Sequence, residues 1–452
     1  MLTDVKSKLS PVSILKFLVP SILGVFIFMT PVMSKNGITI PVAIMSNAVQ
    51  SIFADILPAV TVALICISAI GSIITKLVKP KFITEHKFLN NLFNVTPLWF
   101  VVRLVGAAIG VMVLFKVGPE FIWSENTGGM VLFGLLPILF SVFLFAGLFL
   151  PLLLNFGLLE FFGTLLTKVM RPIFKLPGRS SVDCIASWLG DGTIGVLLTS
   201  KQYEDGFYSQ REACVIGTTF SFVSITFSLV VISTVGLGHM FVPFYITTLI
   251  AGIVAAIIVP RIRPLSKKPD SYYGGKKNHV SETIPDGHSS FSWGLNQAVI
   301  RAEKSSDFKS TAFESIQNVM DMWLGVMPVV MAVGGIALMI AEYTPIFKIL
   351  GLPFIPLLNL LQIPEAVAAS QTLVVGFADM LLPSVIAANI TSEMTRFIIA
   401  AVSVTQLIYL SEVGGLLLGS KIPVSLKDMI IIFLERTIIT LPVITLIANI
   451  IF

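Results

Sequence analysis

The sequence predicts an all-α polytopic membrane protein with about nine transmembrane helices and two re-entrant hairpins in inverted-topology repeats. Three observations support this fold class. The 452 residues are 55% hydrophobic and only 12% charged, whereas soluble domains carry about 25% charged residues. The basic residues stand in short clusters between apolar runs, and a polar interruption of these runs recurs in the second half. This composition excludes intrinsic disorder, nucleic-acid binding and a large soluble catalytic domain, despite the net charge of +5.

The transmembrane helices are predicted from runs without charged residues, because a helix needs about 20 mostly apolar residues to cross a bilayer. The uncharged runs are 17–34, 56–75, 126–159, 213–238, 240–260 and 322–341. Further spans are expected at 94–115, which contains Arg103, from 397 through Glu412, and at 437–452. No small-residue cleavage site precedes the first run, so we expect this helix to be retained.

The distribution of basic residues predicts the orientation of these helices. Lys6, Lys8 and Lys16 precede the first span and a lysine cluster at 76–87 follows the second, whereas the loop between the two spans offers only Lys35. Because basic loops stay inside, the N-terminus is predicted to be cytoplasmic, and so is the Lys- and Arg-rich polar loop at 261–318. Residues 1–125 form the predicted set of N-terminal transmembrane helices.

A first unit, residues 126–260, contains a segment that cannot span the bilayer. Arg179 and the basic stretch at 201–211 both belong inside, so the residues between them start and end on one side. Glycines and Asp183 make this segment a poor lipid-facing helix. Because non-helical backbone at membrane depth is tolerated only inside protein or along a cavity, we expect a re-entrant hairpin at 180–200.

A second unit, residues 319–452, repeats this order. Pro364, Gly376 and Asp379 follow one another much as Pro177, Gly190 and Asp191 do in the first unit, and a span follows each segment. We therefore expect a second re-entrant hairpin at 364–389. The basic residues predict that it is entered from outside, so that the two units are inverted. Inverted repeats with paired broken helices are typical of secondary transporters, whose substrate site lies at the midplane.

The segment KLPGRSSVDCIASWLGDGTIGVLLTSKQYEDG at 175–206, followed by REACVIGTTFSFVS at 211–224, resembles a known family. It is similar to the nucleoside-recognition or Gate domain of concentrative nucleoside transporters, FeoB-type ferrous-iron permeases and spore-maturation membrane proteins, and most of all to the YjiH-type group. The resemblance covers roughly residues 130–452 and implies a transporter-like fold with two re-entrant hairpins, in a bacterial cytoplasmic (inner) membrane. No GxxxxGK[ST] motif is present, which excludes a complete FeoB-type permease.

Three acidic residues are candidates for substrate binding and for coupling to protons or sodium. Asp191 and Asp379 lie at the predicted breaks of the two hairpins, where each could face a cavity or cap the second half-helix. Glu412 precedes two glycines inside a predicted span, and an intramembrane carboxylate is by default a functional hypothesis. Its alternative is a structural pair with Arg103 or Lys421. Arg103 itself is expected to snorkel or to pair with an acid.

Uncharged polar residues near the breaks supply hydrogen bonds suited to a polar solute, although the same residues also mediate helix packing in membranes. Several recur at helical spacing in matching positions of the two units, which favours a shared face. The candidate substrate-binding residues are Ser181, Thr193, Ser221, Ser224, Gln371, Thr372, Gln406 and Tyr409.

The function expected from these features is secondary transport of a small polar or zwitterionic solute by alternating access, with nucleosides first and amino acids or small peptides next. Neither the three cysteines nor any other residues form a catalytic or metal-ligand constellation, so we expect no enzyme activity and no cofactor. The expected partners are the solute and the lipid bilayer, without nucleic acid. The main alternative is a non-transport scaffold acting with a second copy or with a partner Gate-domain membrane protein, and an intramembrane enzyme is a third.

Overall fold

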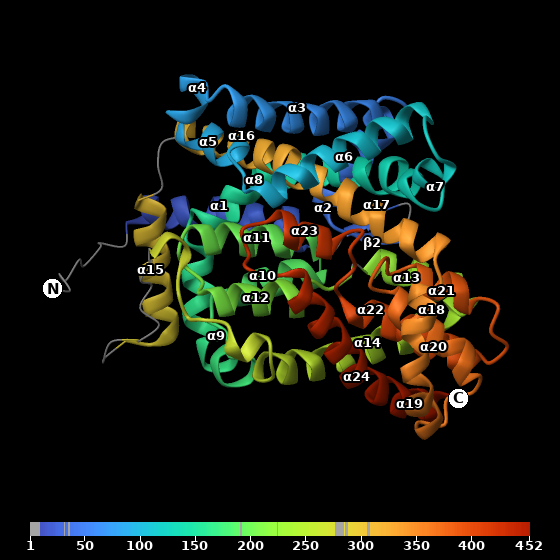
Figure 1. Cartoon of the computed structure of the whole chain (residues 1–452). Helices are drawn as coiled ribbons and strands as arrows, with labels where there is room; N and C mark the ends of the chain where they lie inside the picture. The colour runs from blue at the N-terminus through green and yellow to red at the C-terminus, as the bar shows by residue number, and fades with distance from the viewer. Residues whose placement is uncertain are drawn as a thin grey trace.

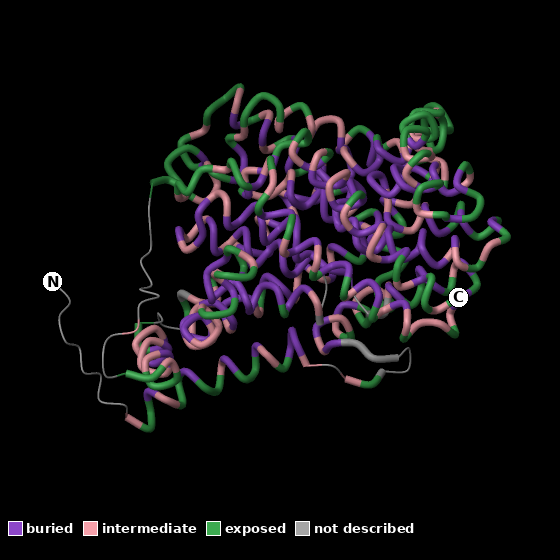
Figure 2. The backbone as a smooth tube through the Cα atoms, turned by 90° about the horizontal axis from the view of Figure 1, so that it is seen from below, coloured by how far each residue is buried: buried purple, intermediate pink, exposed green. Residues whose placement is uncertain are grey.

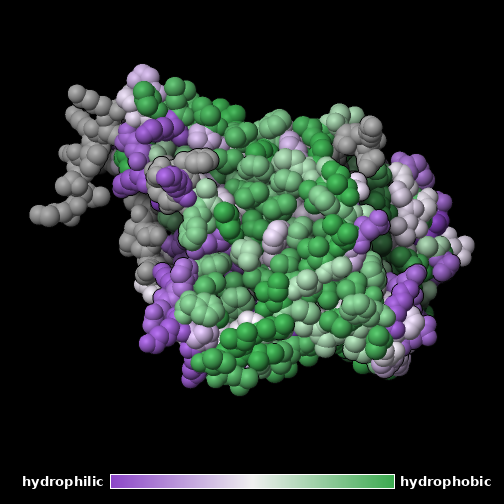
Figure 3. Space-filling view, turned by 90° about the horizontal axis from the view of Figure 1, so that it is seen from above, coloured by the Kyte–Doolittle hydropathy of each residue, from purple (hydrophilic) through white to green (hydrophobic). Residues whose placement is uncertain are grey.

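The computed structural model describes residues 10–30, 32–34, 37–189, 192–223, 225–275, 284, 288–304 and 308–452. Within these residues, seven helices are long and apolar enough to cross a membrane. Figure 3 shows a broad apolar face between hydrophilic ends, the distribution expected of a chain surrounded by lipid. The prediction of an all-α, multi-pass membrane protein is thereby confirmed.

The N-terminal part forms an outer layer against the rest of the molecule. In chain order its elements are α1 (Pro11–Met29), β1 (Val32–Ser34), β2 (Gly37–Thr39), α2 (Pro41–Ile52), α3 (Leu57–Leu77), α4 (Lys81–Thr84), α5 (Lys87–Phe93), α6 (Pro97–Phe115) and α7 (Glu120–Trp123). The two strands form an antiparallel hairpin in which Val32 pairs with Thr39. The N-cap Ser10 and the proline that follows it start α1, because proline tolerates the first helical turn.

The first unit begins with a π-helix and ends with a long apolar helix. Its elements are η1 (Met130–Leu135), α8 (Leu136–Leu154), α9 (Leu158–Phe174), α10 (Ser180–Leu189), α11 (Gly192–Glu204), α12 (Gln210–Thr219), α13 (Ile225–Thr234), η2 (Gly238–Met240) and α14 (Phe241–Ile258). Helices α10 and α11 pack against each other as a pair. This pair covers the segment predicted as the first hairpin.

A polar connection joins the two units. It contains η3 (Val259–Arg261), η4 (Leu265–Lys267), η5 (Tyr273–Gly275), α15 (Ser290–Lys304) and α16 (Phe308–Asp321). Helix α15 packs on α1 and α9, at the end of the molecule where α9 lies in Figure 1. Helix α16 continues into the next apolar helix, so the membrane-length helix runs over 311–343 and begins inside the stretch expected to be a loop.

The second unit repeats the order of the first. Its elements are η6 (Met322–Val326), α17 (Met327–Tyr343), α18 (Ile346–Gly351), η7 (Leu352–Phe354), α19 (Ile355–Leu360), α20 (Ala366–Val375), α21 (Leu382–Ala387), α22 (Glu393–Gln406), α23 (Val413–Gly419) and α24 (Leu426–Ile451). Each unit starts with a π-helix followed by a proline in the first turn of an α-helix, Pro137 in one and Pro328 in the other. The inverted orientation of the two units stays a prediction.

Two of the predicted spans are each divided into two shorter helices. The run 213–238 contains α12 and α13, which are separated by residues 220–224, and the span beginning at 397 contains α22 and α23, which are separated by residues 407–412. The breaks lie inside the molecule, because residues 220–223 and 407–411 are all buried, whereas α13 and the outer faces of α1 and α3 contain exposed residues (Figure 2). The two breaks therefore lie within protein.

Candidate substrate site

The break after α12 contacts the start of α11. The carbonyl oxygens of Ser221 and Phe222 face Gly192, where a Cβ atom would lie 2.8 and 3.0 Å from them. A side chain at position 192 would therefore collide with the broken backbone, and glycine permits this close approach. The arrangement brings the pair α10–α11 against the interrupted helix of the same unit.

The break after α22 is bonded to the turn between α20 and α21. The backbone amides of Leu410 and Ser411 donate to the carbonyls of Phe377 and Ala378, at 2.8 and 3.0 Å. Asp379 joins the same turn, because its carboxylate accepts from the Leu381 amide and from the Ser411 hydroxyl, both at 2.8 Å. Asp379 therefore fixes the turn that precedes α21, whose N-cap is Leu381.

A cavity of about 110 Å³ lies where the two breaks meet. Helix α8 closes one side, and both units contribute to the other walls. The lining residues are Leu135, Ile138, Leu139, Val142, Gly192, Thr193, Ser221, Phe222, Val223, Phe227, Met380, Tyr409, Glu412 and Val413. Four predicted binding residues, Thr193, Ser221, Tyr409 and Glu412, are thus brought together around one cavity. We call it the central cavity.

The central cavity combines few polar groups with apolar walls. The Ser221 hydroxyl donates to the Gly217 carbonyl at 2.6 Å and the Tyr409 hydroxyl to the Val404 carbonyl at 3.2 Å, so both retain acceptor capacity. Glu412 lies at the N-cap of α23 and is half-buried. The volume is below the roughly 300 Å³ of typical ligand sites. Binding of a nucleoside-sized solute would therefore require its walls to move apart.

The remaining predicted site residues lie elsewhere. Gln406 is fully buried at the end of α22, and its amide donates to the Leu373 carbonyl at 2.7 Å and to Thr437 at 2.8 Å. Ser181 and Thr372 are buried in α10 and α20, and Gln371 is half-buried beside Thr372. None of these four lines the central cavity. Two further candidates, Asp191 and Ser224, fall outside the described residues.

Sequence reasoning missed Arg436, which is completely buried in α24. Its Nε donates to the Thr405 carbonyl at 2.9 Å, and its Nη1 lies 3.5 Å from the Thr219 carbonyl. These carbonyls end α22 and α12, where the helix dipole is negative. One guanidinium therefore connects the C-terminal ends of both interrupted helices. The detectable signal was an arginine directly before the last predicted apolar run, 437–452.

A second buried group anchors the pair α10–α11. The carboxylate of Asp183 accepts from the Tyr208 hydroxyl at 3.0 Å and from Thr199 at 3.2 Å. Arg179 stacks over the Phe207 ring, with its guanidinium carbon 3.7 Å from the centroid. Asp183 was expected to make the segment unsuited to lipid, and these contacts supply the protein environment that it needs.

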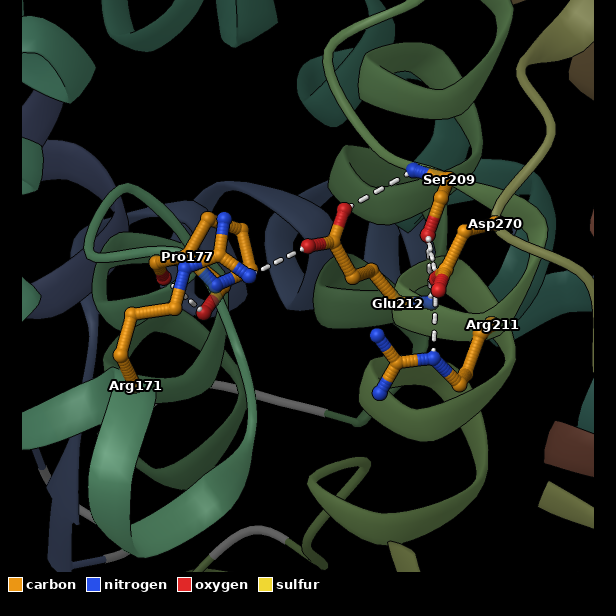
Figure 4. Close-up of polar contacts among 7 residues, drawn as sticks. Arg171, Pro177, Ser209, Arg211, Glu212 and Asp270 are labelled. Carbon is orange, nitrogen blue, oxygen red and sulfur yellow. Dashed lines mark hydrogen bonds and ion pairs between the residues drawn. The ribbon is translucent and has the colours of Figure 1, made fainter. Parts of the chain in front are cut away.

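A network of polar side chains fixes the start of α12 (Figure 4). Ser209 and Glu212 form a capping box, and Glu212 also accepts from Arg171 of α9 at 2.7 Å. Arg211 pairs with Asp270 of the polar connection at 2.9 Å. These contacts hold the broken helix between α9 and the connection, so its C-terminal end is directed toward the central cavity.

The other intramembrane arginine has a local role. Arg103 of α6 is buried and donates to the Ser72 hydroxyl at 3.0 Å and to the Leu92 carbonyl at 2.8 Å. It therefore joins α6 to α3 and α5. Among the described residues, no group of three or more His, Cys, Asp and Glu side chains could hold a metal ion.

Comparison with known proteins adds three findings. A family model described as Gate, nucleoside recognition, matches residues 136–238. A protein of Alkalihalophilus pseudofirmus, whose name says only that it is uncharacterized, is 55% identical over 438 residues, which cover 97% of this chain and 95% of that protein. The chain also aligns with the solved structure of CNTnw, a concentrative nucleoside transporter, which carries two substitutions and is in an outward-facing state. The alignment covers 91% of this chain and 99% of the CNTnw chain, at 12% identity and a TM-score of 0.35.

Proposed function

Because this chain belongs to the same family as the Alkalihalophilus protein and its residues 136–238 match the Gate model, we propose that it is a secondary transporter of a small polar or zwitterionic solute. The Gate domain indicates a non-enzymatic membrane protein with a transporter-like role. Nucleosides are the first solute class to test, since the Gate model is described by nucleoside recognition. Amino acids and small peptides come next.

The observation that carries the proposal is the meeting of two interrupted helices at one cavity. Gly192 and Thr193 come from α11, Ser221 from the first break, and Tyr409 and Glu412 from the second. Residues from both units therefore surround the same space. In a transporter built from two inverted repeats, a solute bound at such a junction is exposed to either side as one unit moves against the other.

Coupling to protons or sodium is proposed to use the acidic residues at the breaks. Glu412 is the best placed, because it lines the central cavity at the start of α23. Asp379 would act through Ser411, with which it shares a hydrogen bond of 2.8 Å. Asp191 is kept as the corresponding acid of the first hairpin. Alternating access, the two re-entrant hairpins and the inverted repeat are parts of the same proposal.

The competing proposal is a non-transport scaffold that acts with a second copy or a partner membrane protein. Asp379 accepts hydrogen bonds from the Leu381 amide and the Ser411 hydroxyl. These bonds favour the scaffold if holding this turn is the whole role of Asp379. The two proposals differ in what Glu412 does. A transporter needs its carboxylate for solute or ion binding, whereas a scaffold tolerates Glu412→Gln without any change in ligand response.

The test is the thermal stability of detergent-purified protein with nucleosides, amino acids and small peptides, at several pH values and with or without sodium. A ligand that binds only the folded state raises stability by RT ln(1 + [L]/Kd), about 2.7 kcal/mol at one hundred times Kd. We expect one solute class to raise the melting temperature, and Glu412→Gln and Ser221→Ala to reduce that shift. Ser228→Ala is the matched control, because Ser228 is buried outside the cavity. No shift in well-folded protein would refute the transporter.

A further inference from the structure

A second and larger cavity, of about 570 Å³, opens beside the ends of α5, α11 and α23. Helices α4, α5 and α16 lie at one end of the molecule (left in Figure 1), which is the end predicted to face the cytoplasm. We call this space the inner cavity. Its volume falls within the roughly 300–1,000 Å³ of small-molecule sites. It shares no lining residue with the central cavity.

Acidic and basic side chains line the inner cavity. Glu204 ends α11 and Asp321 ends α16, while Lys421 follows α23 and Lys201 lies one turn before Glu204. Asp321 and the two lysines lie near enough to Glu204 to interact with it electrostatically. The two units therefore supply both acids and bases to one cavity.

These charges are not neutralised by close contacts. Lys201 lies 3.9 Å from Asp205, but among the residues that the structure describes Glu204, Asp321 and Lys421 form no ion pair. Glu204 and Asp321 are half-buried, whereas Lys421 is exposed. Because partly buried charges are costly unless they are paired or hydrated, the two carboxyl groups gain most from an occupant that brings a positive charge, and Lys421 remains free to contact its negative end.

An independent observation marks the wall of this cavity as a binding surface. Asn318 lines it, is only 8% exposed, and leaves its Nδ2 donor without a partner in the described part of the chain. Buried amide groups are normally satisfied. A carboxylate or carbonyl oxygen of a solute bound in this cavity, which Lys421 also lines, would accept from this donor.

From these observations we propose that the inner cavity binds a zwitterionic solute of amino-acid or short-peptide type. The ammonium group lies at Glu204 and Asp321, and the carboxylate lies at Lys421 and the Asn318 amide. This inference rests on the proposed transport function and narrows its solute class. A neutral nucleoside would pair neither with the acids Glu204 and Asp321 nor with Lys421. Leaving these groups unpaired lowers the affinity, so the cavity would discriminate against such a solute.

The experiment measures binding of three probes to the purified full-length protein by titration calorimetry. Alanyl-alanine carries both charges, its N-acetyl form only the carboxylate, and its C-terminal amide only the ammonium. We expect the unblocked dipeptide to bind at least tenfold more tightly than either blocked form. Equal affinity for all three probes, or no binding by well-folded protein, would overturn the proposal.

Two variants assign the ends of the solute. Lys421→Gln should abolish the preference for the free over the amidated dipeptide, and Asp321→Asn the preference for the free over the N-acetylated one. Lys427→Gln is the matched control, because Lys427 is exposed and does not line the cavity. If a variant fails to fold, Lys421→Arg and Asp321→Glu keep the charge and should keep the selectivity. Unchanged selectivity in folded charge-removing variants would overturn the assignment.

Uptake into proteoliposomes separates this inference from the transport proposal. Uptake of another solute without dipeptide binding would overturn the inner-cavity assignment and leave transport intact. Dipeptide binding with the expected selectivity, but without uptake of any solute, would support the cavity assignment and refute transport.

Discussion

The side chain of Gln406 should stabilise the attachment of the interrupted helix α22 to α20. The Gln406 amide donates to the carbonyl of Leu373 at 2.7 Å and to the hydroxyl of Thr437 at 2.8 Å. Leu373 lies in the last turn of α20, where carbonyls lack an intrahelical donor. The side chain therefore caps α20 and ties it to α24. The substitution Gln406→Leu keeps the approximate size and removes both bonds.

The expected loss of stability follows from the hydrogen bonds that Leu373 and Thr437 keep after the substitution. The Leu373 carbonyl loses its side-chain donor inside the protein, and leaving a buried group unsatisfied costs about 1–3 kcal/mol. Thr437 still donates to the Phe433 carbonyl at 2.8 Å, so its loss is closer to the roughly 0.6 kcal/mol of an average interhelical bond in membranes. We therefore expect Gln406→Leu to lower the free energy of unfolding by about 2 kcal/mol.

The assay is denaturant unfolding in detergent, with Gln371→Leu as the matched control. Gln371 lies in α20, is half-buried and makes no side-chain hydrogen bond among the described residues. The same chemical change there should alter stability by less than about 0.5 kcal/mol. Equal effects of the two substitutions, or no loss from Gln406→Leu, would refute the role assigned to Gln406.

Two other substitutions test the breaks. Gly192→Ala would place a Cβ 2.8 Å from the Ser221 carbonyl oxygen, and this overpacking should cost about 1–3 kcal/mol of stability. Gly134→Ala is the control, because a Cβ there meets no atom within 4 Å and should not lower the melting temperature. A loss of stability at both positions would contradict the close contact at Gly192. Arg436→Met leaves the buried Thr405 carbonyl without its Nε donor, and since leaving a buried group unsatisfied costs about 1–3 kcal/mol, we expect a lower melting temperature. An unchanged or higher melting temperature in thermal scans would mean that the guanidinium does not hold the two helix ends together.

The sequence allowed the membrane class to be predicted because it depends on local composition, whereas the division into two inverted units stays a prediction. Uncharged runs locate the long helices, and glycines with Asp183 marked the segment of the first hairpin. The breaks in α12–α13 and α22–α23 were not predicted as breaks, because residues 220–224 and 407–412 contain neither glycine nor proline and continue the apolar runs around them, with only serines and Glu412 interrupting. Only contacts with other segments, such as Ser411 with the α20–α21 turn, reveal them.

The candidate site was predictable only in part. Matching polar positions pointed to Ser221 and Tyr409, which do line the central cavity, but also to Gln406, which is used in packing. The reason is that a polar residue in an apolar helix must find a partner whether that partner is a solute or a carbonyl. The same ambiguity hid Arg436, whose carbonyl partners lie more than 30 residues away in sequence. Spacing alone does not distinguish these cases.

Accessibility of the central cavity from both sides of the membrane tests the transport proposal most directly, and it needs no knowledge of the solute. Ser221→Cys, in a background without Cys66, Cys184 and Cys214, would be treated with a membrane-impermeant thiol reagent in right-side-out and in inside-out vesicles. Ser228→Cys, buried outside the cavity, is the control and should not react. We predict labelling at position 221 from both faces. Labelling from one face only, or from neither, would contradict alternating access at this cavity.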